Sequence, residues 1–435
     1  MHEVFKGCDP FRKQPELSTF LALQNGPDDF DRLKHWLCTP PQYTTLRVNT
    51  LAVSVAEAKA RLQTYVDSCS RGEPEKGYVV TEHPQLDDTL VVISSKNRIQ
   101  LTPAHRQVIV DLECGEAVLR GANVFVPGLM GAPGSLTQGD EVAVYADVDN
   151  DCRRGNKRYY KGGKVFVGNG VARLSRDDIF KNRVTQGVAI DVTQPVYNCP
   201  PLNNVFRDLL FLQNIPSIVC SRVLDPQPGE TVLDMCSAPG GKTVHIATLM
   251  RNQGTIIALD KAQARLQKTA DNCMRWRLTS VRCFDHDGTL PFDDNPGMNN
   301  VPRQFDRVMV DAPCSALGQR PRLLYRQSLK EVNSYPTVQR SLLKTACALL
   351  RTAGVLVFST CTINVVENED VVVWALNNLP LELVPQIPHL GGFGRSAVGL
   401  TEIDRKMLQR FEGLHEGNDF DRDTIGFFIA KFRRK

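Results

Sequence analysis

Apolar and polar positions alternate in a regular way along the second half of the chain. Short β-branched apolar runs, each the length of a buried strand, are separated by longer stretches with apolar residues at helical spacing. Strands are expected at residues 231–235, 255–260, 305–311, 355–359 and 424–432, and helices at residues 209–224, 265–277, 338–350 and 367–376. This order predicts an α/β fold, a doubly wound Rossmann-like sheet whose ligands collect at the carboxyl ends of its strands.

The first half of the chain has a different pattern. Residues 28–37 and 54–62 have helical spacing, and residues 43–50 alternate like a strand. From residue 105 to 192 the pattern changes to short strands and glycine turns, which predicts a small β-barrel. Those strands are expected within residues 114–128, 139–144, 164–172 and 187–190. We therefore expect three domains, an α/β domain at residues 1–104, the barrel at 105–193 and the doubly wound domain at 194–435.

The stretch Thr231–Thr243, which reads TVLDMCSAPGGKT, joins a strand to a helix start through a loop of small residues. Such a loop lets a ligand approach the backbone N–H groups at a helix N-terminus. A phosphate-binding P-loop would need a glycine at position 236, which is Cys236. A dinucleotide fingerprint would need separated glycines, whereas Gly240 and Gly241 are adjacent. S-adenosylmethionine, which has no phosphates, is the third ligand to consider.

Two later carboxylates fit that methyl donor. Asp260 ends the next strand, where an acid would hold the ribose hydroxyls, and Asp287 follows the third strand, where a polar residue would reach the adenine. Either acid taken alone is more simply a cap on a turn between strand and helix. Their order along the chain favours S-adenosylmethionine over the two phosphate-bearing ligands.

Composition narrows the class of protein. The chain has 435 residues, of which 42% are hydrophobic and 23% charged, so it is globular with more than one domain. No apolar run approaches the ~20 residues that span a bilayer, and Met1–Lys6 contains no hydrophobic signal region. The 13 cysteines include no C-x-x-C pair, which argues for reduced thiols and against a structural metal site. We expect a cytoplasmic monomer without a metal or a membrane partner.

A cluster of basic residues lies within the predicted barrel. The net charge of +4 permits a nucleic-acid partner without requiring one, so local clustering must decide. Six cations surround Tyr159 and Tyr160 with no acid between them: Arg153, Arg154, Lys157, Arg158, Lys161 and Lys164. Such a loop suits contact with a phosphate backbone, with an aromatic ring stacked on an unpaired base. The simpler alternative is a solvated hairpin tip.

Two thiols follow two further strands of the predicted sheet. Cys314 lies in Asp311–Ser315, after the fourth strand, and Cys361 lies in Ser359–Thr362, after the fifth. Both loops should open on the same edge of the sheet as the donor. Carbon 5 of cytosine is too weak a nucleophile to take a methyl group unaided, whereas a thiolate added to carbon 6 activates it. A helix N-terminus lowers the pKa of a nearby thiol, and Asp311 could hydrogen-bond the ring nitrogen or amino group.

These motifs together carry a family resemblance. The predicted barrel resembles a PUA domain, an RNA-binding barrel, in residues 120–122, 127–128, 139–140 and 168–175. The rest of the chain resembles the NOP/Sun family of RNA cytosine-5 methyltransferases, with an inserted PUA domain as in the family's sixth branch, which acts on the acceptor end of tRNA. The matching stretches are TTLRVNT at 44–50, CSAPGGK at 236–242, DAPC at 311–314, GQRP at 318–321, STCT at 359–362, ENE at 367–369 and GFFIA at 426–430.

The resemblance assigns roles to residues. It implies a class I methyltransferase domain in which Cys361 is the nucleophile, Cys314 assists product release and Asp311 supports catalysis. The implied donor contacts are Cys236, Ser237, Ala238, Pro239, Gly240, Gly241, Lys242, Asp260, Asp287 and Asp311. The RNA contacts expected from the loop and the PUA match are Arg120, Arg153, Arg154, Lys157, Arg158, Tyr159, Lys161 and Lys164. The chain departs from the family's pattern at Ser237, where alanine is usual, and at Ala316, where glycine is common.

The implied substrate is RNA. The resemblance points to a cytosine near the 3′ end of the tRNA acceptor stem, cytosine 72, with the PUA domain holding the CCA tail, and to messenger RNA hairpins of similar shape. The target base must leave its stack, which costs least near a frayed stem end. Two rivals remain open, a non-catalytic RNA-binding protein that keeps the fold and an ATPase that acts on RNA.

Overall fold

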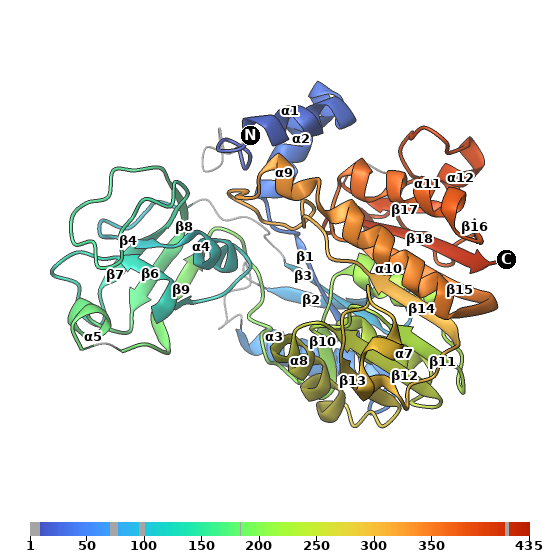
Figure 1. The fold of residues 1–435 in the computed structure, drawn as a ribbon. Coiled ribbons are helices and arrows are strands. Elements are labelled where there is room, and N and C mark those ends of the chain that lie inside the picture. The colour runs from blue at the N-terminus through green and yellow to red at the C-terminus, as the bar shows by residue number, and fades with distance from the viewer. Residues whose placement is uncertain (1–8, 70–76, 95–100, 183, 414–416) are drawn as a thin grey trace.

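The computed structural model describes residues 9–69, 77–94, 101–182, 184–413 and 417–435, so Met1–Lys6 lies outside it. The described part of the chain contains three sheets. The six-stranded sheet stands to one side of the molecule, and the eight-stranded sheet forms the centre of the other side (Figure 1). Among the described residues, no helix has the length and apolar character needed to traverse a bilayer.

The eight-stranded sheet is doubly wound, as the hydrophobic pattern predicts. Its strands are β11 (Thr231–Asp234), β12 (Thr255–Asp260), β13 (Val281–Asp285), β14 (Phe305–Asp311), β15 (Leu350–Thr360), β16 (Leu381–Leu383), β17 (Leu408–Phe411) and β18 (Phe427–Arg434). The spatial order is β13-β12-β11-β14-β15-β18-β16, and β17 pairs with β18. Strands β11 to β15 are parallel, while β18 runs antiparallel to β15. The order reverses between β11 and β14, which is where ligands bind in such sheets.

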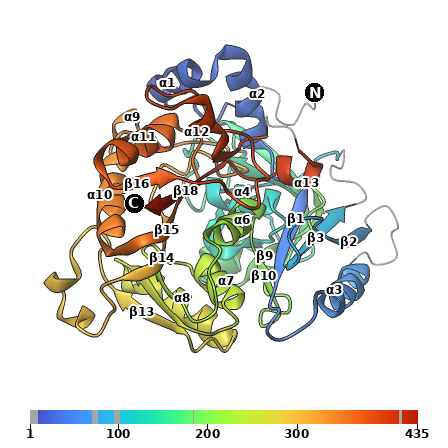
Figure 2. The same cartoon turned by 90° about the vertical axis from the view of Figure 1, so that its right-hand side faces the viewer.

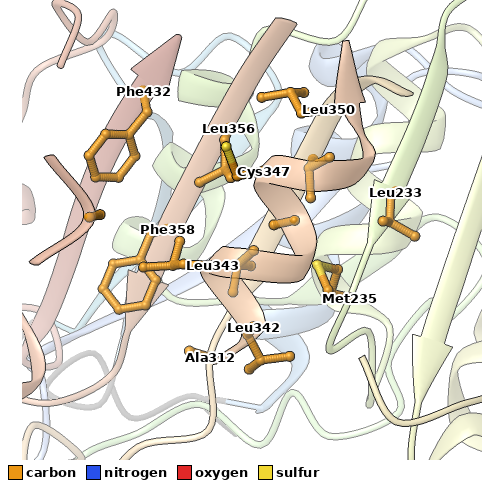
Figure 3. Packing of buried hydrophobic residues seen from close by; sticks show 14 of the residues in the cluster. Leu233, Met235, Ala312, Leu342, Leu343, Cys347, Leu350, Leu356, Phe358 and Phe432 are labelled. Carbon is orange, nitrogen blue, oxygen red and sulfur yellow. The ribbon is translucent and has the colours of Figure 1, made fainter. Parts of the chain in front are cut away.

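Helices cover both faces of this sheet, which is why its strands are apolar on both sides. On one face, α6 (Ile215–Leu224), α7 (Gly241–Leu249) and α8 (Gln263–Arg275) pack on residues such as Val232 and Met309. On the other face, α10 (Tyr335–Leu349) and α11 (Glu369–Asn378) pack on Leu233 and Phe358. Figure 3 shows α10 lying over this face of the sheet, with Leu342, Leu343 and Cys347 in the same cluster as Leu233, Leu356 and Phe358. The two layers hold the carboxyl ends of the strands rigidly.

The four-stranded sheet combines the N-terminal region with a segment from much later in the chain. Its order is β10-β1-β3-β2, with β1 (Tyr43–Val48), β2 (Tyr78–Glu82), β3 (Thr89–Ser94) and β10 (Leu210–Leu212), all antiparallel. Figure 2 shows β1, β3 and β2 side by side, with α3 (Val55–Cys69) beyond them. The N-cap of α3 is as expected, since Ser54 Oγ accepts from Glu57 N at 3.2 Å. Helices α1 (Pro15–Asn25) and α2 (Pro27–Cys38) precede this sheet.

The prediction of a single helix over residues 209–224 is wrong. Residues 210–212 form β10, and α6 begins only at Ile215. Leu46 pairs with Leu212 and Val48 with Leu210, so strand pairing with β1 overrides the helical spacing of this stretch. Pro216 then starts the helix in its first turn, where a missing N–H is harmless.

The six-stranded sheet has the order β5-β9-β8-β7-β4-β6. Its strands are β4 (Gln107–Val110), β5 (Val124–Phe125), β6 (Leu129–Gly131), β7 (Glu141–Asp147), β8 (Lys164–Ala172) and β9 (Val188–Pro195), with α5 (Arg176–Phe180) before β9. The expectation of a strand at residue 114 is wrong, because Leu112–Leu119 forms helix α4. Asp111 caps this helix through Cys114 N, and Gly115 packs so closely on Ala146 that a Cβ would lie 2.3 Å from the Ala146 Cβ.

The remaining helices are short. Helices α9 (Leu329–Val332), α12 (Glu402–Lys406) and α13 (Asp419–Arg422) lie in connections between the larger elements. The helix expected to be continuous over residues 367–376 is interrupted. A 3₁₀ turn over Val365–Glu367 ends at Asn368, whose φ of −113° and ψ of −91° are not helical, and α11 follows from Glu369.

The six-stranded domain is fastened to the loop that follows Cys314. Glu116 on α4 accepts from Leu323 N at 2.9 Å and from Arg322 Nη1 at 3.2 Å. Arg322 N in turn donates to Leu37 O at 2.7 Å, at the end of α2. These contacts tie the first two domains to a loop at the carboxyl edge of the eight-stranded sheet.

Candidate active site

The loop after β11 is held in a defined shape by the elements around it. Ser237 N donates to Leu259 O at 2.8 Å, and Asn272 Nδ2 donates to Pro239 O at 2.8 Å. Gly240 has a φ of +100°, and a Cβ there would lie 2.9 Å from Thr269 Cα on α8. Only glycine combines that backbone conformation with this close approach. The loop therefore presents its N–H groups at the start of α7 from a fixed position.

A cavity of about 330 Å³ opens beside this loop. Its lining includes Cys236, Ala238, Asp260, Asp287 and Asp311, five of the ten predicted donor contacts. Asp260 Oδ1 accepts from Ala262 N at 3.0 Å, which fixes the carboxylate at the end of β12. Lys261 and Arg265 also line the cavity, with Arg265 paired to Asp260 at 3.4 Å. The carboxylates suit ribose hydroxyls and an amine, as S-adenosylmethionine presents them. We refer to this space as the donor cavity.

A second cavity, of about 310 Å³, adjoins the donor cavity. Cys236, Ala238, Asp311 and Cys361 line both, so these residues form the common wall between the two spaces. Four more of the predicted donor contacts line this second cavity instead, namely Ser237, Pro239, Gly241 and Lys242. Its far side is built from Phe211–Asn214, Gln319 and Phe427. We refer to it as the target cavity, since a planar ring placed there would contact the common wall.

The two thiols meet at that wall. Cys314 Sγ and Cys361 Sγ are 3.3 Å apart, and Cys314 lines the donor cavity while Cys361 lines both cavities. The hydrogen bond from Cys314 lowers the pKa of Cys361, with further help from Gln319 and the charge on Lys242, while the same bond and burial raise the pKa of Cys314. Of the two thiols, Cys361 is therefore the one whose ionisation is favoured, and Cys314 is placed to donate a hydrogen bond to its thiolate.

The cause of that shift differs from the expected one. The sequence pointed to a helix N-terminus, but the 3₁₀ turn begins only at Val365 and α11 only at Glu369. The neighbouring thiol, an amide and an ammonium group provide the stabilisation instead.

A chain of hydrogen bonds fixes the carboxylate on the common wall. Lys242 Nζ lies 2.8 Å from Asp311 Oδ2, and Ser359 Oγ donates to Asp311 Oδ1 at 2.7 Å. Lys242 also lies over the Phe427 ring, 5.1 Å from its centroid. Asp311 is thus held by β15 on one side and by α7 on the other, between the two cavities.

The loops that carry the two thiols share one buried support. Glu367 is 0% exposed and accepts from Ser315 N at 2.8 Å, from Ser315 Oγ at 2.5 Å and from Asn364 Nδ2 at 2.9 Å. Ser315 follows Cys314 and Asn364 follows Cys361 by three residues, so one carboxyl group connects both loops. Burial raises the pKa of Glu367 despite these hydrogen bonds.

The lowered pKa of Cys361 predicts the pH dependence of its alkylation. Since the thiolate is the reactive form, reactivity is lost as the pH falls through the pKa and is present above it. We expect iodoacetamide to alkylate Cys361 with a midpoint below 9.0, the ordinary value. Replacing Lys242 with methionine should move this midpoint upward, because it removes a cation that favours the thiolate. Peptide mass spectrometry at each pH measures the rate.

Cys220 is the internal control for that experiment. It is fully buried, and burial raises its pKa to about 12. It should stay unmodified while Cys361 reacts. An alkylation midpoint of Cys361 at or above 9.0 would contradict the thiolate assignment.

The basic residues of the loop between β7 and β8 are of two kinds. Arg154 donates to Pro127 O at 2.7 Å and Leu129 O at 2.9 Å, and Lys164 Nζ donates to Tyr160 O at 2.6 Å, so both hold the loop together. Tyr160 is buried and donates to Asp147 at 2.8 Å. Arg153, Lys157, Arg158, Tyr159 and Lys161 are exposed, with Tyr159 70% exposed, and Arg154 is exposed as well despite its hydrogen bonds within the domain.

Arg120 lies apart from that loop, at the C-cap of α4. Burial lowers its pKa, while Glu116 and Arg322 are its charged neighbours. It therefore belongs to the side of the domain that contacts the loop after Cys314. A search of the described residues finds no group of three or more His, Cys, Asp or Glu side chains that could hold a metal ion.

Several residues of the site escaped the sequence-based prediction. Phe211 lies within β10, the strand that was mistaken for helix, and Gln213 follows it directly. Phe427 begins β18. Gln319 and Ser359 fall within the GQRP and STCT motifs, but the sequence assigned them no role. The position of these motifs after predicted strands could have indicated that both residues lie near the site. Nothing in the sequence around Gln213 indicates that it does.

Comparisons with known proteins agree with this geometry. Residues 221–433 match the family model described as 16S rRNA methyltransferase RsmB/F, and residues 106–195 match the PUA domain. The chain is 42% identical to the mouse tRNA (cytosine(72)-C(5))-methyltransferase NSUN6, with 94% of this chain and 91% of the relative covered. It is 31% identical to a Pyrococcus horikoshii tRNA (cytosine(72)-C(5))-methyltransferase, with 96% of each covered.

The structural comparison covers the whole molecule. The crystal structure of NSun6 from Pyrococcus horikoshii with SFG has a TM-score of 0.79 and 28% sequence identity, and covers 96% of this chain and 97% of that one. The arrangement of all three sheets is therefore shared, and not only that of the doubly wound part.

Proposed function

Because this chain belongs to the RsmB/F (NOP/Sun) family and is an S-adenosylmethionine-dependent RNA cytosine-5 methyltransferase with a PUA domain, we propose that it methylates a cytosine at the 3′ end of the tRNA acceptor stem through a covalent Cys361 adduct. The observation that carries the proposal is the common wall, where Cys361, Cys314 and Asp311 line the boundary between the two cavities. The names of the relatives, which act on cytosine 72 of tRNA, support the choice of substrate.

In the proposed mechanism the Cys361 thiolate adds to carbon 6 of a cytosine in the target cavity, which makes carbon 5 nucleophilic. S-adenosylmethionine supplies the sulfonium methyl group when it is bound. Asp311 accepts a hydrogen bond from the amino edge of the ring, and Lys242 keeps that carboxylate in place. After methylation the carbon 5 proton is lost to solvent and the carbon–sulfur bond breaks. The Cys314 thiol then donates to the departing Cys361 thiolate and so assists release.

The residues proposed to hold the donor fall into two groups. Asp260 and Asp287, which line the donor cavity, would hold its ribose and adenine. The loop from Cys236 to Lys242 would hold its amino-acid tail through backbone N–H groups, at the common wall where Cys236 and Ala238 reach the donor cavity. In this assignment Gly240 acts through the shape that it allows the loop to take.

Sequencing of bisulfite-treated RNA tests the proposed substrate. The protein is incubated with donor and total tRNA, and a new unconverted cytosine at position 72 is the expected result. A parallel sample of messenger RNA hairpins with the same end sequence tests the second substrate class. Absence of any protected cytosine would favour the rival of a non-catalytic RNA-binding protein, and ATP hydrolysis without donor binding would favour the ATPase.

The exposed cations of the basic loop are proposed to contact the RNA backbone. Neutralising Arg153, Lys157, Arg158 and Lys161 together should weaken binding and reduce the slope of log K against log salt, by roughly 0.7–0.9 for each phosphate contact that is lost. Fluorescence anisotropy with labelled tRNA at several salt concentrations measures both quantities.

Arg154 and Lys164 serve as the contrast in that experiment. They donate to carbonyl groups within the domain, so their replacement should lower stability as well as affinity. If the slope of log K against log salt is unchanged in the variant with four substitutions, the loop is a solvated hairpin tip that does not contact RNA.

We also propose the division into domains at residues 1–104, 105–193 and 194–435, with a monomeric protein in the cytoplasm. The three sheets support the division, although β10 from the third part completes the sheet of the first. Light scattering after size-exclusion chromatography tests the oligomeric state.

A further inference from the structure

The TTLRVNT stretch contains a buried charge that the mechanism leaves unused. Arg47 on β1 is 0% exposed, and its charge is far from solvent. Its hydrogen bonds go to neutral groups, from Nε to Gln213 Oε1 at 2.9 Å and from Nη2 to Gly241 O at 3.3 Å. The guanidinium lies 4.6 Å from the centroid of the Trp276 ring and 5.6 Å from that of Phe211. A buried charge costs free energy, so its presence at this place calls for a role.

The contacts of Arg47 converge on one wall of the target cavity. Phe211, Gln213 and Gly241 all line that cavity. Gln213 itself is only 8% exposed, and its backbone is held to Thr45, whose Oγ1 donates to Gln213 O at 2.6 Å. Arg47 thus stands directly behind the cavity wall and touches both the strand segment and the donor loop that form it.

The guanidinium determines which way the carboxamide of Gln213 faces. Arginine can only donate hydrogen bonds, so the oxygen of Gln213 must point at Arg47 and the nitrogen must point away from it. Gln213 Nε2 donates to Ser217 Oγ at 3.1 Å. A Cβ built on Gly241 would lie 3.6 Å from Nε2, which places this nitrogen at the donor-loop edge of the cavity. Because an amide nitrogen carries two N–H groups, one is left for a ligand in the cavity.

We propose that Arg47 is a positioning residue, which orients Gln213 so that its amide N–H donates to an acceptor oxygen of the flipped nucleotide. This inference rests on the proposed function, since it takes the occupant of the cavity to be a cytidine. A ring whose amino group faces Asp311 has its ribose on the opposite side, and its O2 lies on the ring carbon next to the ribose-bearing nitrogen. The acceptor is therefore the base carbonyl O2 or the ribose 2′-oxygen.

Replacing Gln213 with methionine tests the donated hydrogen bond. Methionine has a similar size but no N–H, so we expect the KM for RNA to rise roughly tenfold with unchanged donor affinity. The melting temperature should fall as well, because Arg47 Nε loses its acceptor. Gln213→Glu is the matched variant, because its carboxylate keeps the contact with Arg47 and presents no N–H. It should show the same loss for RNA, which a purely structural role of Gln213 would not predict.

An RNA with 2′-deoxycytidine at the target position separates the two acceptors. If the acceptor is the ribose oxygen, the KM of the wild-type protein should rise by the same factor on this RNA, and Gln213→Met should cause no further rise. If the acceptor is O2, the effect of Gln213→Met is the same on both RNAs. Wild-type kcat/KM in both the methionine and the glutamate variants would overturn the inference.

A double-mutant cycle tests whether Arg47 acts through Gln213. Arg47→Lys should raise the KM for RNA by a similar factor, and combining it with Gln213→Met should add little to the loss, because both remove the same hydrogen bond. Additive losses would overturn the positioning role.

Arg307→Lys is the control for removing a buried arginine. Arg307 lies at the other end of β14, where it contacts Glu230 at 2.6 Å and Leu224 O at 2.6 Å. This change should lower stability with no change in the KM for RNA. These outcomes differ from those expected if the proposed function itself is wrong. In that case even the wild-type protein would methylate no RNA cytosine.

Discussion

Cys361→Ala is expected to abolish methyl transfer to RNA, by a factor on the order of 10⁴ or more, because no other group on the common wall can replace the nucleophile. The sulfur of Cys314 lies 3.3 Å away. In this variant Cys314 loses the hydrogen bond to Cys361 that contributes most to its raised pKa, but burial still raises the pKa and so disfavours the thiolate. The donor cavity is lined mainly by other residues, so donor affinity should stay the same. Transfer of labelled methyl groups to tRNA and calorimetric titration with the donor measure the two quantities.

Cys347→Ala is the matched control for that variant. Cys347 is a buried thiol on α10, on the opposite face of the sheet, where it packs in the core shown in Figure 3. Its loss should lower the stability by about 1 kcal/mol, as expected for a small buried group, and leave the activity per folded molecule unchanged. If Cys361→Ala still forms a covalent adduct with RNA, the nucleophile would be Cys314 and not Cys361.

The sequence was informative wherever a strand is buried on both faces. Residues 255–260 (TIIALD) and 305–311 (FDRVMVD) each contain an apolar run that ends in aspartate, and the structure has strands with those same bounds. Because parallel strands end at a common edge, the order of motifs was enough to bring Cys314 and Cys361 together. The local pattern therefore predicted the position of the chemistry without any knowledge of tertiary contacts.

Elements that depend on distant partners were missed. Leu210–Leu212 is a strand only because β1, more than 160 residues earlier, offers its free edge, and helical spacing continues through it in the sequence. The pKa of Cys361 was expected to fall for one reason and falls for another, since the thiol that donates to it comes from a loop 47 residues away. The role of Gln213 could not be predicted for the same reason, because its orientation is set by an arginine on β1, 166 residues earlier in the chain.

Replacing Cys314 with alanine is the second change with a large expected effect, and it should act on a different step. Alanine removes the thiol that donates to Cys361 Sγ, while the nucleophile itself and the Glu367 support through Ser315 remain. Addition of Cys361 to the base should still occur, although more slowly, because the pKa of Cys361 rises when the hydrogen bond that lowers it is lost. Release is affected more strongly, because a departing thiolate is stabilised by hydrogen-bond donors and the variant loses the main one, keeping only the side chain of Gln319.

The expected result for Cys314→Ala is therefore a covalent protein–RNA species that persists through denaturing electrophoresis, with turnover reduced roughly 10²- to 10⁴-fold, the range typical of a lost proton donor. The species should contain methylated cytosine, since the block comes after methyl transfer, and it should be absent from the Cys361→Ala and Cys314→Ala double variant. Cys314→Ser provides the graded case, because a hydroxyl restores a donor in nearly the same place and should recover part of the release rate. A Cys314→Ala protein that turns over normally, or a serine variant that traps as much adduct as alanine, would show that hydrogen bonding to the leaving sulfur does not control release.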